Sequence, residues 1–143
     1  MFLRIISTLS LLVTVLSANT VKDCSTGTSL FKFTSGSLIP DPVVPGQNSS
    51  LTINAQIPDG VTISDGTSTY GLSLNGIPFP GSTDPLCTQV ECPLLPGPYT
   101  NTTTSVFPAG ISGKIVSKIQ WYDTSNTLLL CTEILQEYNL KLY

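Results

Sequence analysis

Eleven glycines and eleven prolines are spread along the 143-residue chain, so few segments are long enough to form an uninterrupted helix. The segments between them alternate apolar and polar side chains instead. Leu51, Ile53, Ala55 and Ile57 are each separated by one polar residue. A period of two is typical of a strand with one buried face. The sequence therefore predicts an all-β protein.

Similar patterns predict further strands, and turn residues lie between several of them. The turn candidates are Asp59-Gly60, Asn75-Gly76 and residues 123–126. The pattern leaves open whether residues 136–143 continue the last strand. About seven strands without an internal repeat favour a two-sheet β-sandwich. The other predicted strands lie around residues 31–33, 61–63, 70–74, 115–121 and 128–134.

Residues 1–18 have the pattern of a secretory signal peptide. Arg4 precedes a largely apolar run over residues 5–16, and the small residues Ser17 and Ala18 follow it. The run is shorter than the roughly 18 to 20 apolar residues that span a bilayer, so an uncleaved anchor is the less favoured alternative. Cleavage near Ala18 would leave one domain, residues 19–143, with a formal charge of −4 instead of −3. We expect the mature protein to be secreted or to reside in the endolysosomal lumen.

The chain has four cysteines, and all of them follow this leader. An even number in an oxidising compartment predicts two disulfides, for which three pairings are possible. Cys87 and Cys92 are close in sequence in a segment bounded by Pro and Gly, which favours a local bridge and leaves Cys24 to pair with Cys131. A zinc site is disfavoured because the chain has no CxxC pair and no histidine.

The absence of histidine excludes Ser-His-Asp and Cys-His catalytic pairs and imidazole metal sites. The carboxylates, including Asp84, Glu91, Glu133 and Glu137, show no spacing that indicates paired acid and base groups. The excess of acidic over basic residues argues against binding to nucleic acid. We therefore expect no enzymatic activity, no metal, no cofactor and no nucleic-acid partner.

Asn48 and Asn101 each begin an Asn-X-Ser/Thr sequon in a polar segment. Such segments are typical of exposed loops, and in a secreted protein the sequon is an acceptor for N-glycosylation. The sequence therefore predicts two surface loops at these positions, either of which can carry a glycan.

Short motifs follow one another from residue 22 to residue 134. They are Lys22-Asp23-Cys24, Pro40-Asp41-Pro42, Pro45-Gly46, Gly76-Ile77-Pro78-Phe79-Pro80, Asp84 with Cys87, Cys92-Pro93-Leu94, Pro96-Gly97, Trp121 with Asp123, and Cys131-Thr132-Glu133-Ile134. In order and spacing they resemble the MD-2-related lipid-recognition (ML) family, especially its phosphatidylglycerol/phosphatidylinositol transfer and Niemann-Pick type C2 branches. The resemblance also supports pairing Cys24 with Cys131 and Cys87 with Cys92. The Niemann-Pick branch has a further short-range disulfide that residues 25–45 lack, which weakens the case for a sterol ligand.

The resemblance implies an immunoglobulin-like sandwich whose two sheets separate to hold one lipid. Two acyl chains contain about 30 methylenes, and exposing them to water costs on the order of 20 kcal/mol, so a carrier must enclose them. The implied protein is a monomer that moves phosphatidylglycerol and phosphatidylinositol between membranes through transient membrane contact. The alternatives are a sterol carrier and an immunoglobulin-like recognition module without a cavity.

The resemblance also implies which residues contact the lipid. Phe79, next to Ile77 in the Pro-rich motif, is expected in the pocket. One face of a strand is expected to form its wall, and residues 96–113, rich in Pro and Gly, are expected to form a mouth loop. For each candidate residue, the alternative to lipid contact is packing in an ordinary hydrophobic core. The remaining candidates are Ile115, Ile119 and Trp121 on the strand, and Tyr99, Phe107 and Ile111 at the mouth.

Overall fold

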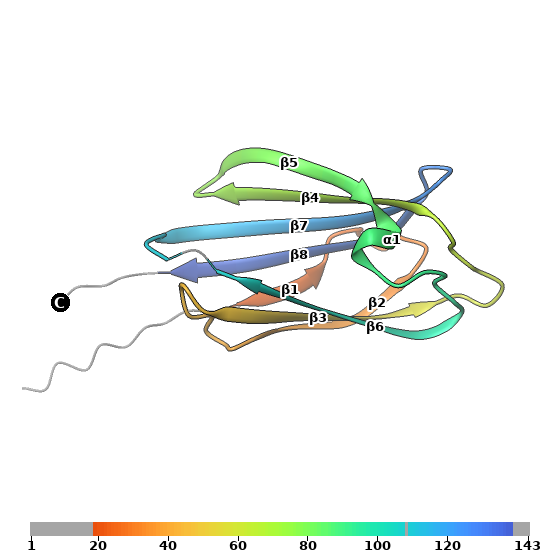
Figure 1. Cartoon of the computed structure of the whole chain (residues 1–143), viewed down its shortest axis with the longest axis horizontal. Helices are drawn as coiled ribbons and strands as arrows, with labels where there is room; N and C mark the ends of the chain where they lie inside the picture. Colours follow the sequence, from red (N-terminus) through yellow and green to blue (C-terminus); the bar gives the residue numbers. More distant parts are fainter. Residues whose placement is uncertain (1–18, 108, 139–143) are drawn as a thin grey trace, which may run out of the picture.

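The computed structural model describes residues 19–107 and 109–138, which form two antiparallel sheets that face each other (Figure 1). The expected leader, residues 1–18, lies outside the described residues. A single-turn helix, α1 (Leu86–Gln89), lies at one end of the sandwich. The five-stranded sheet has the order β1 (Thr20–Asp23), β8 (Leu128–Tyr138), β7 (Gly113–Asp123), β4 (Gly66–Leu74), β5 (Ile77–Pro85), and the three-stranded sheet has the order β2 (Lys32–Ile39), β3 (Asn48–Ile57), β6 (Gly97–Val106).

The alternating patterns in the sequence match the inner faces of the sheets. On β3, Ile53, Ala55 and Ile57 are buried, as the period of two predicted. On β7, Ile115 and Trp121 are buried. The buried residues form two clusters, one beside α1 and one at the opposite end of the sandwich. The two-sheet β-sandwich is therefore confirmed.

The sandwich is closed along one side, where β1 lies beside β2. Gly36 of β2 makes this possible, because a Cβ atom there would collide with the side chain of Val21 on β1. The opposite side is bordered by β5 and β6, each the outermost strand of its sheet. The two sheets are therefore in contact along β1 and β2, on the side away from β5 and β6.

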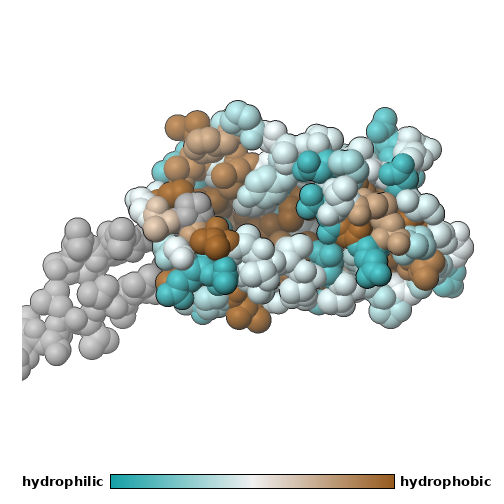
Figure 2. All heavy atoms as spheres, viewed as in Figure 1, coloured by the Kyte–Doolittle hydropathy of each residue, from teal (hydrophilic) through white to brown (hydrophobic). Residues whose placement is uncertain are grey.

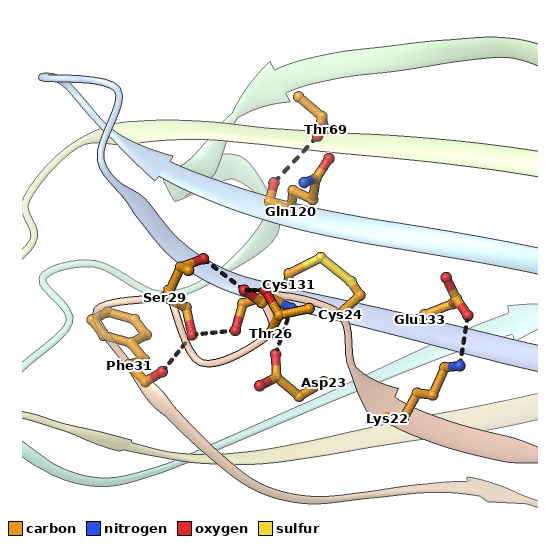
Figure 3. Close-up of a disulfide and its surroundings, with 12 residues drawn as sticks. Lys22, Asp23, Cys24, Thr26, Ser29, Phe31, Thr69, Gln120, Cys131 and Glu133 are labelled. Carbon is orange, nitrogen blue, oxygen red and sulfur yellow. Dashed lines mark hydrogen bonds and ion pairs between the residues drawn. A yellow bond between two sulfur atoms is a disulfide. The ribbon is translucent and has the colours of Figure 1, made fainter.

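Both disulfides have the expected pairing. The Cys24–Cys131 bridge joins residues 107 positions apart and connects the end of β1 to β8 (Figure 3). On the same strand pair, Lys22 Nζ lies 3.2 Å from Glu133 Oε1. The Cys87–Cys92 bridge spans only five positions and encloses most of α1. The first bridge thus holds the two ends of the domain together, and the second holds one local turn.

The structure corrects two expectations about the elements and decides one question that the sequence left open. The described residues form eight strands, in agreement with the expected number of about seven, but residues 61–63 contribute only an isolated bridge from Ile63 to Leu94. The last strand, β8, continues past Ile134 to Tyr138. Residues 97–106 form the strand β6, although a loop was expected. The unpredicted strands β5 and β6 are edge strands, the position in which proline is tolerated within a sheet. Within the described ranges, no helix is long and apolar enough to cross a membrane.

Candidate lipid-binding cavity

A cavity of about 630 Å³ lies between the two sheets. Figure 2 shows it as a hollow with apolar atoms inside and paler, more polar residues around it. Side chains from β2 to β8, from Gln89 at the C-terminal end of α1 and from the following residue, Val90, line its wall or its opening. Binding sites for small molecules typically measure about 300 to 1,000 Å³, so the cavity is in the range that accommodates a ligand.

Strand register explains the wall of the cavity. On the five-stranded sheet, Phe79 of β5 pairs with Leu72 of β4, which in turn pairs with Ser117 of β7. Tyr70 of β4 pairs with Ile119 of β7 in the neighbouring row. Because opposite residues in a sheet project to the same face, each row presents its side chains to the cavity. The wall is therefore built from paired strands, with one irregularity in the β4–β5 pairing between Tyr70 and Leu72.

Six of the eight lipid-contact candidates line the cavity, and the other two do not. Ile77 lies at the start of β5 and is 67% exposed outside it. Tyr99 lies on β6, where its ring meets the ring of Trp121 edge to face at a centroid distance of 6.1 Å, so it packs on the core beside the cavity. The candidates that line the cavity are Phe79, Phe107, Ile111, Ile115, Ile119 and Trp121.

Burial raises the pKa of the Tyr99 hydroxyl above its ordinary value. The hydrogen bond from Asn101 opposes this shift, and the charge of Glu91 adds to it. A raised folded-state pKa stabilises the fold below the unfolded pKa of about 10, and this contribution is lost as the pH rises through the folded value. We expect the free energy of unfolding to fall less steeply above pH 10 in Tyr99→Phe than in the wild type. Urea unfolding at several pH values measures this difference, and identical slopes would contradict it.

The cavity wall also contains polar residues that the sequence did not predict. Hydroxyl and amide side chains come from both sheets, and Asp84 is the one charged side chain among the described lining residues. The period-two pattern identifies inward positions by their apolar side chains, so it did not indicate polar side chains that face inward. The polar lining residues other than Asp84 are Ser49, Ser68, Tyr70, Ser82, Gln89, Asn101, Thr103, Ser105, Ser117 and Gln136.

The two faces of β6 have different partners. On the outer face, Thr102 Oγ1 lies 3.0 Å from Thr52 Oγ1, and Thr100 Oγ1 donates to Asn54 Oδ1 at 2.7 Å. These contacts with β3 form a polar ladder on the surface of the three-stranded sheet. The inner face carries Asn101 and Thr103 into the cavity lining. β6 therefore presents polar side chains both to the outer surface and to the cavity.

The two sequons lie in strands, so the prediction of loops was wrong. Asn48 is the first residue of β3 and is exposed. Asn101 is half-buried in the middle of β6, where it lines the cavity. Alternating side chains on a strand place Asn101 inward, which leaves Asn48 the more accessible acceptor.

The fold and the cavity together define a β-sandwich with an internal site for an apolar ligand. Comparison with known families gives the same class, because residues 18–137 match the ML domain. The chain belongs to the ML family, whose members bind lipids.

A phosphatidylglycerol/phosphatidylinositol transfer protein from Cryptococcus neoformans var. neoformans serotype D is 27% identical over 128 residues, which cover 83% of this chain and 70% of the relative. Two solved structures share the fold. A Niemann-Pick type C2 protein from Japanese carpenter ant has a TM-score of 0.59 at 16% identity, covering 83% of this chain and 98% of the other. Chicken MD-1 complexed with lipid IVa has a TM-score of 0.60 at 11% identity, covering 87% of this chain and 91% of the other.

Proposed function

We propose that this protein binds one phospholipid between its sheets and transfers it between membranes, with phosphatidylglycerol and phosphatidylinositol as its ligands. The observation that carries the proposal is the cavity of about 630 Å³, lined by apolar side chains from both sheets. Acyl chains enclosed there avoid a cost of about 0.8 kcal/mol for each methylene exposed to water. The named fungal relative supports the choice of these two phospholipids. The exchange is non-covalent and needs no catalytic group.

The charges of the cavity indicate how such a ligand is oriented. None of the four lysines in the described part of the chain lines the cavity, and Asp84 would repel a phosphate. An anionic phosphate is therefore better placed at or beyond the opening, with the acyl chains inside. We place the mature monomer, residues 19–143, in a secreted or endolysosomal compartment, because two disulfides and a leader-like segment fit an oxidising environment.

A vesicle assay tests the proposal. Delipidated protein is added to donor vesicles that contain fluorescent phosphatidylglycerol or phosphatidylinositol and to unlabelled acceptor vesicles. We expect it to accelerate transfer of both lipids, and an unlabelled phospholipid to compete better than a sterol. If the protein accelerates neither lipid, or if sterol alone competes, the assignment of phospholipids is wrong.

Exposed apolar residues at the end opposite α1 favour this end as the membrane contact. Ile39 ends β2, and Ile77 begins β5 next to the Asn75-Gly76 turn. Val44 lies in the β2–β3 loop, which is tied to the β6–β7 loop by a hydrogen bond from the Gly46 N–H to the Phe107 carbonyl oxygen. Figure 2 shows apolar residues gathered at this end. Such residues can enter the interface of a bilayer while lipid is exchanged.

We expect the double variant Ile39→Asp/Ile77→Asp to transfer phospholipid at least about tenfold more slowly, because two carboxylates oppose insertion into the bilayer. The amount of lipid bound by the protein should not change, since neither side chain lines the cavity. Leu95→Asp is the matched control, because Leu95 is 58% exposed near the other end of the sandwich. Equal transfer rates for the double variant and the control would contradict the proposed contact.

A further inference from the structure

Gln136 places a buried amide on the inner wall of the cavity. It lies on β8, where its register partner on β7 is Ile115, and both residues line the cavity. Its side chain is only 6% exposed. Among the described residues, none forms a hydrogen bond with its side-chain amide. A polar side chain of a residue that is more than nine-tenths buried thus lines the cavity without a hydrogen-bonding partner among the described residues.

The surroundings of Gln136 are apolar. The cluster at this end of the sandwich contains Ile115 and Ile134, its neighbours on β7 and β8, together with Phe107. An amide in such surroundings is destabilising unless it has a hydrogen-bonding partner, and buried amides in folded proteins almost always have one. A molecule that enters the cavity can supply this partner, because Gln136 lines the cavity.

Thr132 provides a useful contrast on the same strand. It lies four residues before Gln136 on the same face of β8, is completely buried, and its hydroxyl also has no partner. Thr132 does not line the cavity, however, so a ligand does not reach it. Of these two residues, only Gln136 can therefore meet a ligand in the cavity.

A second polar group lies close to Gln136 on this wall. Ser117 of β7 pairs with Ile134, which places it diagonally across from Gln136 on the same face. Diagonal neighbours in a sheet are separated by about 7 to 8 Å. The Ser117 hydroxyl lies 3.3 Å from the Tyr70 hydroxyl, which also lines the cavity. Gln136, Ser117 and Tyr70 thus place hydrogen-bonding groups on the five-stranded side of the cavity wall.

We infer that Gln136 donates a hydrogen bond from Nε2 to an ester carbonyl oxygen of the bound phospholipid. Ester carbonyls are the polar atoms that a diacyl lipid carries next to its tails, so they are the ones able to accompany the acyl chains into the cavity. The inference rests on the proposed function and adds a specificity to it: the protein selects acyl-ester lipids over ether lipids that have the same head group and chain length. An ether oxygen is a weaker acceptor, so it leaves the amide poorly paired.

The test compares binding of diester and dialkyl-ether phosphatidylglycerol to the delipidated full-length protein. We expect the wild type to bind the diester roughly tenfold more tightly, which is the effect of a hydrogen bond whose loss leaves a buried amide unpaired. The variant Gln136→Leu should bind both lipids with similar affinity. Thr132→Val is the matched control, because it removes an unpaired polar atom from the same strand face and should keep the preference of the wild type.

Three results would overturn the inference, and they differ in what else they contradict. Equal binding of the two lipids by the wild type, or a preference that persists in Gln136→Leu, excludes the role of Gln136 and leaves phospholipid binding intact. Binding of neither lipid contradicts the proposed function as well. Thermal unfolding shows whether Gln136→Leu folds, and Gln136→Met serves as a second apolar variant. The comparison of the two lipids in the wild type needs no substitution.

Discussion

Phe79→Asp lowers both the lipid content of the protein and its rate of phospholipid transfer, each by at least about tenfold. Phe79 lines the cavity from β5, opposite Leu72, and is 49% exposed. A carboxylate at this position is unfavourable beside acyl chains and would be desolvated by a bound lipid. Bound phospholipid per chain, measured after exposure to vesicles, and the transfer rate give the two readouts.

A control on the same strand separates the cavity from the surface. Ile77 precedes Phe79 by two residues but does not line the cavity. Ile77→Asp should therefore keep the lipid content of the wild type even if its transfer is slower. Because Phe79 lies on an edge strand and is half exposed, its replacement should leave thermal stability nearly unchanged. Normal lipid content in folded Phe79→Asp would refute the assignment of this side chain to the site.

The second large effect concerns stability. Replacing Cys24 and Cys131 together by Ser should lower the free energy of unfolding by about 4 to 5 kcal/mol, because the bridge restricts a long loop in the unfolded chain. The sequence separation is 107 residues. Small domains have a total stability of about 5 to 15 kcal/mol, so this loss is a large part of the whole. Urea unfolding of the purified variant measures it.

The other disulfide provides the comparison. Cys87 and Cys92 are five positions apart, so the same chain-entropy relation gives a loss of only about 2 kcal/mol when both are replaced by Ser. The bridge also lies around α1, outside the strand ladders. Equal losses for the two double variants would show that loop length does not determine the effect of these bridges.

Periodicity was enough to predict the strands whose inner faces are apolar. β3 and β7 alternate in the sequence as they do in the sandwich, because one face of each packs on the core. The disulfide pairing also followed from spacing and from the family resemblance. The turn at Asn75-Gly76 was predicted because these two residue types tolerate positive φ best, and both residues have positive φ in the structure.

The missed strands β5 and β6 have a common physical cause. β5 contains prolines and β6 is rich in threonine on both faces, so neither shows an apolar and polar alternation. Both are edge strands beside the opening of the cavity, where one face is not packed against the opposite sheet. For the same reason the sequence did not show that Ile77 and Tyr99 lie outside the cavity lining. The strand that carries each of them does not follow the alternating pattern. A strand face that borders a cavity is not packed against the opposite sheet, so it need not be apolar. The sequence of such a strand can therefore lack the alternation by which strands are recognised.

Gln136 illustrates this limit most clearly. It occupies an inward position on β8, in line with Ile134, where the pattern calls for an apolar residue. In the sequence, a polar residue there indicates the end of a strand, so the segment after residue 134 was left undecided. Only the register with Ile115 shows that the strand continues and that the amide faces the cavity.

The central claim is that the interior of this protein holds a phospholipid. Mass spectrometry of the gently purified protein under native conditions, followed by analysis of its organic extract, tests this most directly. We expect a mass increase that corresponds to one lipid per chain, and phosphatidylglycerol or phosphatidylinositol in the extract. A protein that carries no lipid, and that takes up none when incubated with vesicles of these phospholipids, would contradict the claim.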